Sequence, residues 1–489
     1  MPPLSGCFLT LQLWWMSKGF VGVGLVWSSV LERFERHAPA SVMARLALEH
    51  ALPAGWVDDV FEAHRQRQYL RELLFSTVVE LTTLVSLGLR PSLHAAARQM
   101  PALPVSLASL YDKVNHSEPG VLRALVRGSA ERLAPVVATL GTPASLPGWQ
   151  VRVLDGNPLP ASDKRLLPLR ALRGAALPGH SLVAYDPDLG LVVDLVACED
   201  AHASERAGVA PLLEGTRPGE LWIADRHYCT RTVLRGLEGA GACFIVREHA
   251  NHPRLVQQGE WQDRGRTETG AVREQTITVA EAQARWRRIE LALDQPTEDG
   301  DTTLWLWSNL PEAVTAGRIT ELYRTRWRIE GMFGRLESVL HSELRSLGHP
   351  RAALLGFAAA VLAYNVLALL QRAVEQAHQP PPAPPSPAVP PPPAPPLEVS
   401  CFHLAVQVRG GYEGLLIALP PEHWPRWNEA DPAGLAQHLL RLARNINPRQ
   451  VATSKRGPKA AKPKGYLDGK TARAHVATAR LLAKTKTTP

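Results

Sequence analysis

Three acidic residues stand where they could carry out chemistry at phosphorus. Asp155 follows the short β-branched run VRVL, Asp225 follows the apolar run ELWIA, and Glu330 lies in a segment with helical periodicity. Carboxylate oxygens suit Mg²⁺ or Mn²⁺, and three carboxylates can bridge two such ions about 3.5 to 4 Å apart. If the fold brings the three together, they form a two-metal site for attack on a phosphodiester. Taken alone, either aspartate is more commonly a turn former or a helix cap.

The glutamate belongs to residues 319–340, for which we expect a single helix. At about 3.6 residues per turn, Tyr323, Arg326, Glu330 and Glu337 fall on one stripe of it. A second stripe is apolar and consists of Leu322, Ile329, Met332, Phe333, Leu336 and Leu340. An ordinary amphipathic helix gives the same pattern, so this helix does not decide the function by itself.

The elements that position the two aspartates are predicted strands. VRVLDG and ELWIADRHY read as buried strands, and two apolar runs joined at Asp186-Pro187-Asp188 read as a hairpin. Residues 205–213 and 230–239 have helical patterns, and ACFIVRE is the next strand. Because strand ends in a mixed sheet are where side chains from separate segments converge, these elements could bring Asp155 and Asp225 together.

These residues also carry a resemblance to a known family. The spacing Tyr323-x-x-Arg326-x-x-x-Glu330, preceded by strands ending at Asp155 and Asp225, resembles the DDE transposases of bacterial insertion sequences that have a Tyr-Arg-Glu-Lys (YREK) helix. The resemblance covers about residues 31–370. It implies an α/β fold, with a ribonuclease-H-like catalytic core (a mixed sheet flanked by helices) and a β-rich insertion before the Glu. The interval of 330 − 225 = 105 residues is long enough for that insertion.

The resemblance implies roles for the three acids and for two neighbours of the glutamate. Asp155, Asp225 and Glu330 would be the catalytic residues, and they would bind two Mg²⁺ or Mn²⁺ ions. Tyr323 and Arg326 would contact phosphates at the transposon end, and the planar fork of an arginine suits that contact.

Further DNA contacts transfer more loosely. Arg226, beside the second aspartate, would touch DNA or pair with a carboxylate. Trp305 or Trp307 could stack on an unpaired base near the cleaved end, although two tryptophans in a strand are more often packing residues.

One position departs from the family pattern. The family helix has a lysine seven residues after the Glu, and this chain has Glu337 there. The change replaces a phosphate-binding cation by an anion. It could weaken end binding or mark a decayed copy, or a Lys or Arg of the insertion could supply the missing charge.

Composition limits the kind of protein and its partners. With 489 residues, 45% hydrophobic and 20% charged, the chain is globular, with at least one sizeable core. The net charge of +8 favours a polyanionic partner, which could be nucleic acid or anionic lipid. The five cysteines form no CxxC pair, which argues against a zinc ribbon or a secreted disulfide framework and favours a reducing cytoplasm.

The sequence divides into eight expected segments. They are an apolar leader (1–30), an N-terminal helical domain (31–145), two parts of the catalytic core (146–246 and 311–375) around the β-rich insertion (247–310), a proline-rich linker (376–399), a C-terminal helical segment (400–446) and a basic tail (447–489). Within the first domain, residues 92–117 could form two short helices around a turn and read DNA, or be part of a plain helical bundle. The tail is expected to be disordered until it meets phosphate through residues such as Lys455, Arg456 and Lys459.

A final segment bears on a membrane. Residues 352–370 have the length of a spanning helix, and only Asn365 among them is strongly polar. We expect a buried core helix, with a membrane anchor as the alternative. The resemblance implies a DNA transposase that acts on terminal inverted repeats and target DNA as a homodimer, and we expect it to be cytoplasmic, without a membrane partner. The alternative is an inactive, transposase-derived DNA-binding protein.

Overall fold

The computed structural model describes residues 27–68, 72–100, 103–141, 143–171, 173–251, 253–280, 285–297, 300–379, 396–424, 431–454 and 475–486. The chain divides into two compact units, Met1–Pro53 with Val366–Gly457 and Ala54–Asn365 with Pro458–Pro489. This division differs from the predicted one, because the helical region 31–145 is shared between the two units. The predicted leader, the proline-rich stretch 380–395 and the tail residues Lys455, Arg456 and Lys459 lie largely or wholly outside the described residues.

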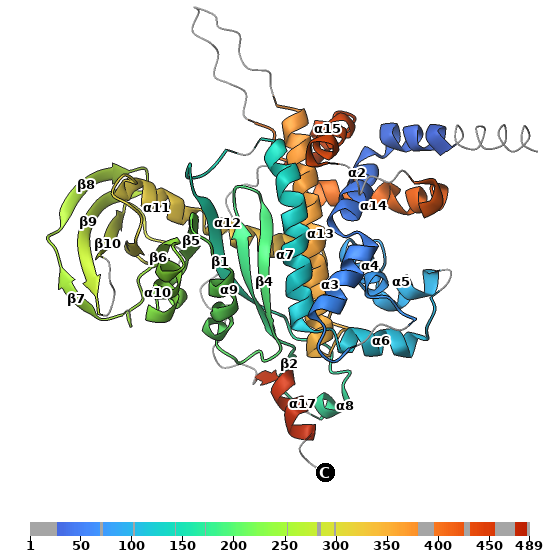
Figure 1. The fold of residues 1–489 in the computed structure, drawn as a ribbon, viewed down its shortest axis with the longest axis horizontal. Coiled ribbons are helices and arrows are strands. Elements are labelled where there is room, and N and C mark those ends of the chain that lie inside the picture. Colours follow the sequence, from blue (N-terminus) through green and yellow to red (C-terminus); the bar gives the residue numbers. More distant parts are fainter. Residues whose placement is uncertain are drawn as a thin grey trace, which may run out of the picture. The chain divides into compact units, whose positions relative to one another are not determined.

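The second unit is built on one mixed sheet of ten strands (Figure 1). Its strands are β1 (Gln150–Pro158), β3 (His180–Asp186), β4 (Leu191–Cys198), β5 (Glu220–Ala224), β6 (Cys243–Arg247), β7 (Leu255–Gln258), β8 (Gln262–Thr267), β9 (Gly270–Val279), β10 (Arg285–Leu293) and β11 (Thr303–Ser308). They lie in the order β4-β3-β1-β5-β6-β11-β10-β9-β7, with β8 also paired to β9. Strands β1, β5 and β6 are parallel and the other pairs are antiparallel. The predicted α/β class is confirmed, and the sheet is consistent with a ribonuclease-H-like core.

The predicted β-rich insertion continues this central sheet. Its last strand, β11, pairs with β6 of the core, with Trp307 opposite Val246. Strands β7 to β10 follow outward from β11, and Figure 1 shows them curving away at the end of the sheet. The insertion and the core are therefore joined by backbone hydrogen bonds as well as by the chain.

Helices cover both faces of the sheet. On one face, α9 (Val209–Gly215) and α10 (Arg231–Gly239) contribute to a core cluster that includes Phe244, Trp286 and Trp307. Thr230 caps α10 by accepting a hydrogen bond from Val233 N, as the predicted helical pattern of 230–239 requires. Helix α7 (Pro119–Thr139) packs on β4, and α11 (Ala316–Arg324) packs on β8, β9 and β10.

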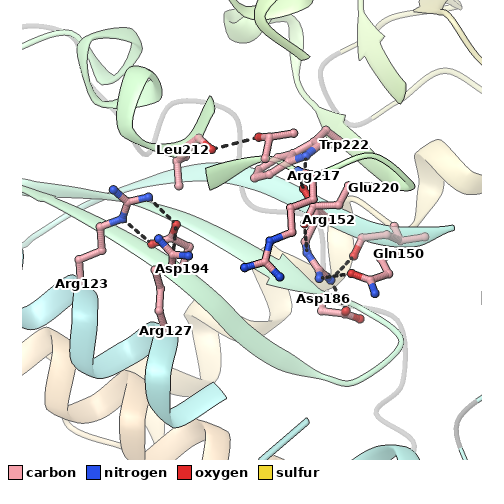
Figure 2. Close-up of polar contacts among 12 residues, drawn as sticks. Arg123, Arg127, Gln150, Arg152, Asp186, Asp194, Leu212, Arg217, Glu220 and Trp222 are labelled. Carbon is pink, nitrogen blue, oxygen red and sulfur yellow. Dashed lines mark hydrogen bonds and ion pairs between the residues drawn. The ribbon is translucent and has the colours of Figure 1, made fainter. Parts of the chain in front are cut away.

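Buried ion pairs fix α7 and the strands in register (Figure 2). Arg123 of α7 donates to both carboxylate oxygens of Asp194 on β4, each over 2.8 Å. Arg152 of β1 pairs with Asp186 of β3 and lies 3.6 Å from Glu220 of β5. These side chains are largely buried, so each charge depends on its partner for stabilisation.

Four short helices precede α7 in this unit: α3 (Ala54–His64), α4 (Phe75–Ser86), α5 (Leu93–Gln99) and α6 (Leu107–Asn115). The prediction of two helices within residues 92–117 is confirmed by α5 and α6. Ser92 and Ser106 cap them by accepting hydrogen bonds from Ala95 N and Ser109 N. Whether this pair enters a DNA groove stays a prediction.

The apolar segment 352–370 lies in one long helix, α13 (Pro350–Ala377). Its length and composition would allow it to cross a membrane, yet its most apolar window is completely buried inside the protein. Asn365, its one strongly polar residue there, exchanges two hydrogen bonds of 2.8 Å with the backbone of Val192 on the edge strand β4. The prediction of a buried core helix is confirmed. The Asn365 side chain supplies the hydrogen bonds that the backbone of Val192 lacks at the edge of the sheet.

The first unit is helical, as predicted for residues 400–446. Helix α2 (Pro39–Ala51) packs against α14 (Cys401–Ala418) and α15 (Pro432–Ala443), and α16 (Pro448–Val451) follows. Ser41 Oγ donates to Val408 O over 2.9 Å, and Arg45 donates to Leu419 O over 2.7 Å. Because α2 is remote in sequence from α14, their pairing could not be read from local patterns.

The last part of the predicted basic tail, residues 475–486, lies within the described residues. Strand β12 (His475–Ala477) pairs in parallel with β2 (Ala175–Leu177), and α17 (Thr478–Lys486) packs on α8 (Leu167–Arg170). Arg480 pairs with Asp200. The expectation of a wholly disordered tail is therefore wrong for residues 475–486, because their backbone and charge find partners on the second unit.

Candidate active site

The sheet brings Asp155 and Asp225 next to one another. In the parallel pair β1–β5, Leu154 is opposite Ala224, so each aspartate is the residue that directly follows this last pair. Strand β5 ends before Asp225, as predicted. Strand β1, however, continues beyond Asp155 to Pro158, because its antiparallel pairing with β3 persists after the pairing with β5 has stopped.

Each aspartate carboxylate also contacts the backbone. Asp155 Oδ1 accepts a hydrogen bond from Gly156 N over 2.9 Å. Asp225 Oδ1 accepts one from His227 N over 2.7 Å and caps the short helix η2 (Arg226–Tyr228). An isolated aspartate is more commonly a helix cap, and Asp225 is indeed one. The same residue also lies next to Asp155.

Glu330 lies on α12 (Trp327–Ser338), and the single helix expected over residues 319–340 is divided into α11 and α12. At the break, the amide groups of Thr325, Arg326 and Arg328 bond three residues back, which tightens the chain into a turn. The Thr325 hydroxyl also donates to Leu322 O over 2.7 Å. Such a side-chain hydrogen bond competes with the backbone hydrogen bonds of a regular helix. Among residues of the predicted apolar stripe, Phe333 is half-buried and the others are fully buried.

Arg326 lies between two of the candidate metal ligands. Its guanidinium is 2.8 Å from Glu330 Oε1 and 3.5 Å from Asp155 Oδ2. The Arg326 and Asp155 side chains are largely buried, whereas Glu330 is 52% exposed. The single positive charge of Arg326 is therefore shared between the first and third acids.

A cavity of about 420 Å³ opens beside these residues. Its acidic lining residues are Asp155, Glu330, Glu337 and Glu343. Within the described part of the chain, no lysine or arginine lines it, so the charge missing at Glu337 is not supplied to this cavity by the insertion. Glu337 and Glu330 share the cavity, as their spacing of two turns predicts.

The concentration of negative charge shifts two carboxyl groups. Burial, together with nearby Asp225 and Glu205, raises the pKa of Asp155 to about 6, although Arg326 opposes the shift. Burial and the charge of Glu337 also raise the pKa of Glu343. Both shifts have the sign expected of acids crowded together without enough cations.

The donor set fits a hard divalent cation, since it consists of carboxylates whose mutual repulsion such an ion would relieve. In the part of the chain that the structure describes, no three Asp, Glu, His or Cys side chains are grouped closely enough to hold one. Glu330 is turned to Arg326 and Asp225 to a backbone amide. Metal binding by the predicted trio thus requires side-chain rotation.

Two predicted DNA contacts differ in accessibility. Arg226 is exposed at the start of η2. Tyr323 is only 6% exposed, and burial raises the pKa of its phenol to about 12. A phosphate can reach Arg226 directly, whereas Tyr323 is covered in the structure.

The two candidate stacking tryptophans are in different surroundings. Trp307 is fully buried in the core and its indole donates to Glu248 over 2.7 Å, which is the packing role that two tryptophans in a strand more commonly have. Trp305 is partly exposed, with the Arg288 guanidinium 4.5 Å from the ring centroid and Trp261 5.4 Å away. A base could reach only Trp305.

One acid beside the site was missed by sequence reasoning. Glu205, in the short helix η1 (Glu205–Gly208), accepts a hydrogen bond from the Tyr228 hydroxyl over 3.1 Å. A Cβ at position 156 would lie 2.2 Å from Glu205 Cδ, so this carboxylate lies directly against Gly156. The only signal in the sequence was the glycine that follows Asp155.

The chain matches a known family over part of its length. A search of curated proteins returns no match. One family model, described as a transposase DDE domain, matches residues 175–366, which include Asp225, Arg326 and Glu330. The matched range begins after Asp155, so it covers the second and third acids but not the first. Over residues 175–366 this chain is therefore similar to the transposase DDE domain.

Proposed function

We propose that the protein is a DNA transposase that binds the terminal inverted repeats of its element, cleaves DNA strands and joins the freed 3′-hydroxyl to target DNA. One observation carries the proposal. Asp155 on β1 lies next to Asp225, which directly follows the adjacent parallel strand β5, and Glu330 lines the same cavity as Asp155, within or beside a region similar to the transposase DDE domain.

Asp155, Asp225 and Glu330 would hold two Mg²⁺ or Mn²⁺ ions. When bound, such a pair activates the attacking water or 3′-hydroxyl and neutralises the leaving oxygen. The chain's own residues prepare the site: burial of Asp155 withdraws it from bulk water, and the backbone amides of Gly156 and His227 orient the two aspartates. No covalent intermediate with the protein is needed.

Arg326 and the exposed Arg226 would bind DNA phosphates. A phosphate oxygen can replace Glu330 as a partner of the guanidinium, which releases the carboxylate into the cavity. Trp305 would stack on an unpaired base, with Arg288 beside it. The protein would act in the cytoplasm on nucleoid DNA, as a homodimer that holds two element ends.

The test is strand nicking by the purified full chain on DNA that carries the ends of its element, with Mg²⁺ or Mn²⁺. Asp155→Asn, Asp225→Asn and Glu330→Gln should each abolish nicking and leave most end binding intact. Glu214→Gln is the matched control, because it removes one exposed carboxylate of α9. Nicking that survives all three substitutions would refute the proposal.

The cavity position of Glu337 motivates a second candidate, the inactive transposase-derived DNA-binding protein. In that case the wild-type chain would bind the ends without nicking them. Glu337→Lys, which restores the charge of the family pattern, distinguishes a weakened enzyme from an inactive one. A weakened enzyme should gain end affinity and nicking, whereas the inactive protein should gain affinity alone.

A further inference from the structure

Glu205 contacts the same backbone position as the first acid of the site. Asp155 turns its carboxylate to the amide of Gly156, and the Glu205 carboxylate fills the space where a side chain at position 156 would be. Gly156 therefore separates two carboxylates that come from different elements, β1 and η1. Any larger residue there would push Glu205 away from the strand.

The surroundings of Glu205 do not neutralise it. Its carboxylate accepts a hydrogen bond from the hydroxyl of Tyr228, a buried and uncharged residue of η2. Within the described residues, no lysine, arginine or histidine lies within ion-pair distance of Glu205. The negative charge of Glu205 repels that of Asp155, and a divalent cation bound between the two carboxylates would relieve this repulsion.

We propose that Glu205 is a fourth carboxylate of the active site and a ligand, directly or through water, of the divalent cation that Asp155 binds. The proposal rests on the proposed function, because it assumes that Asp155 binds such an ion. Tyr228 acts as the positioning residue, since its hydroxyl holds the Glu205 carboxylate toward the strand. Gly156 is required because only glycine leaves room for that carboxylate.

The direct test is Mn²⁺ titration of the DNA-free full chain by calorimetry. Glu205→Gln keeps an oxygen for the Tyr228 hydrogen bond but removes the charge, and should raise the Kd by at least about tenfold. Glu214→Gln, the exposed control on α9, should change it by less than about twofold, because its charge is screened. Asp155→Asn is titrated in parallel as the reference ligand substitution.

The outcomes separate this inference from the proposed function. Weaker binding in both Asp155→Asn and Glu205→Gln supports both. Weaker binding in Asp155→Asn with unchanged binding in Glu205→Gln overturns the role of Glu205 and leaves the proposed function standing. Unchanged binding in both overturns the metal site itself.

A second measurement distinguishes a ligand from a purely structural residue. Glu205→Gln should unfold at the same or a higher urea concentration than wild type without metal, because it removes repulsion between two acids. A lower midpoint in chelator would show that Glu205 acts by holding the fold. In addition, Gly156→Ala should be tolerated in a Glu205→Ala background but destabilise the wild type; equal destabilisation in both would contradict the close contact.

Discussion

Replacing Asp155 by asparagine should stabilise the metal-free protein and abolish the proposed DNA strand cleavage. In the folded chain, burial and the neighbouring acids Asp225 and Glu205 raise the pKa of Asp155 to about 6, from an ordinary value of 3.8. At 1.36 kcal/mol per pKa unit, that gap corresponds to about 3 kcal/mol against folding once the group is ionised in both states. Asparagine has nearly the same shape and carries no charge, so it escapes this cost.

The sign of the pH dependence follows from the raised pKa. The folded state holds the proton of Asp155 more tightly than the unfolded state does. The resulting contribution to the free energy of unfolding is complete below the unfolded pKa near 4 and is lost as pH rises through about 6. The gain from Asp155→Asn should therefore be largest near pH 7.5, at up to about 3 kcal/mol, and roughly half as large near pH 5.

The assay is urea unfolding in chelator at these two pH values for wild type and Asp155→Asn. Asp163→Asn is a suitable control, since that carboxylate is 50% exposed and should respond little at either pH. Adding Mn²⁺ near pH 7.5 should stabilise wild type and leave Asp155→Asn almost unchanged. A variant no more stable than wild type near pH 7.5, or equally stabilised at both pH values, would refute the reasoning.

Three further perturbations test other parts of the structure. Arg326→Gln removes the guanidinium that holds Glu330 and should raise the Mn²⁺ affinity of the DNA-free chain several-fold; unchanged affinity in the titration would contradict its blocking position. Arg123→Ala removes both hydrogen bonds of the Asp194 ion pair and leaves Arg127, 4.0 Å away, as the remaining cation; it should cost about 1 to 3 kcal/mol in urea unfolding, and no measurable loss would contradict the ion pair. Asn365→Leu orphans two buried backbone groups of β4 and should cost about 1 to 3 kcal/mol for each, measured in the same way; a neutral result would show that the edge is satisfied otherwise.

Local patterns in the sequence predicted the strands that place the two aspartates. The runs before Asp155 and Asp225 are short and mostly apolar, which is typical of buried parallel strands. The apolar stripe of residues 322–340 predicted the buried face of α12 for the same reason. These patterns could not predict where a strand ends. Strand β1 continues beyond Asp155 because it stays paired with β3, and that pairing is not visible in the local sequence.

Tertiary surroundings decided the rest. Trp305 and Trp307 lie two residues apart on the same face of β11, so alternation could not separate them. Trp307 packs in the core cluster to which α10 contributes, whereas Trp305 lies beside Arg288. Glu205 escaped notice because its significance depends on contacts with Gly156 and Tyr228, each more than 20 residues away in sequence.

The pairing of β11 with β6 fixes the spacing between the outer strands of the sheet and the strands beside the acids. Hydrogen-bonded strands lie about 4.8 Å apart, so β10 is held about 14 Å from β5, three strand spacings across the sheet. This distance is close to four nucleotide steps of about 3.4 Å. If the outer strands bind DNA, as proposed, a DNA strand held there would reach the acids at a fixed number of nucleotides from that contact.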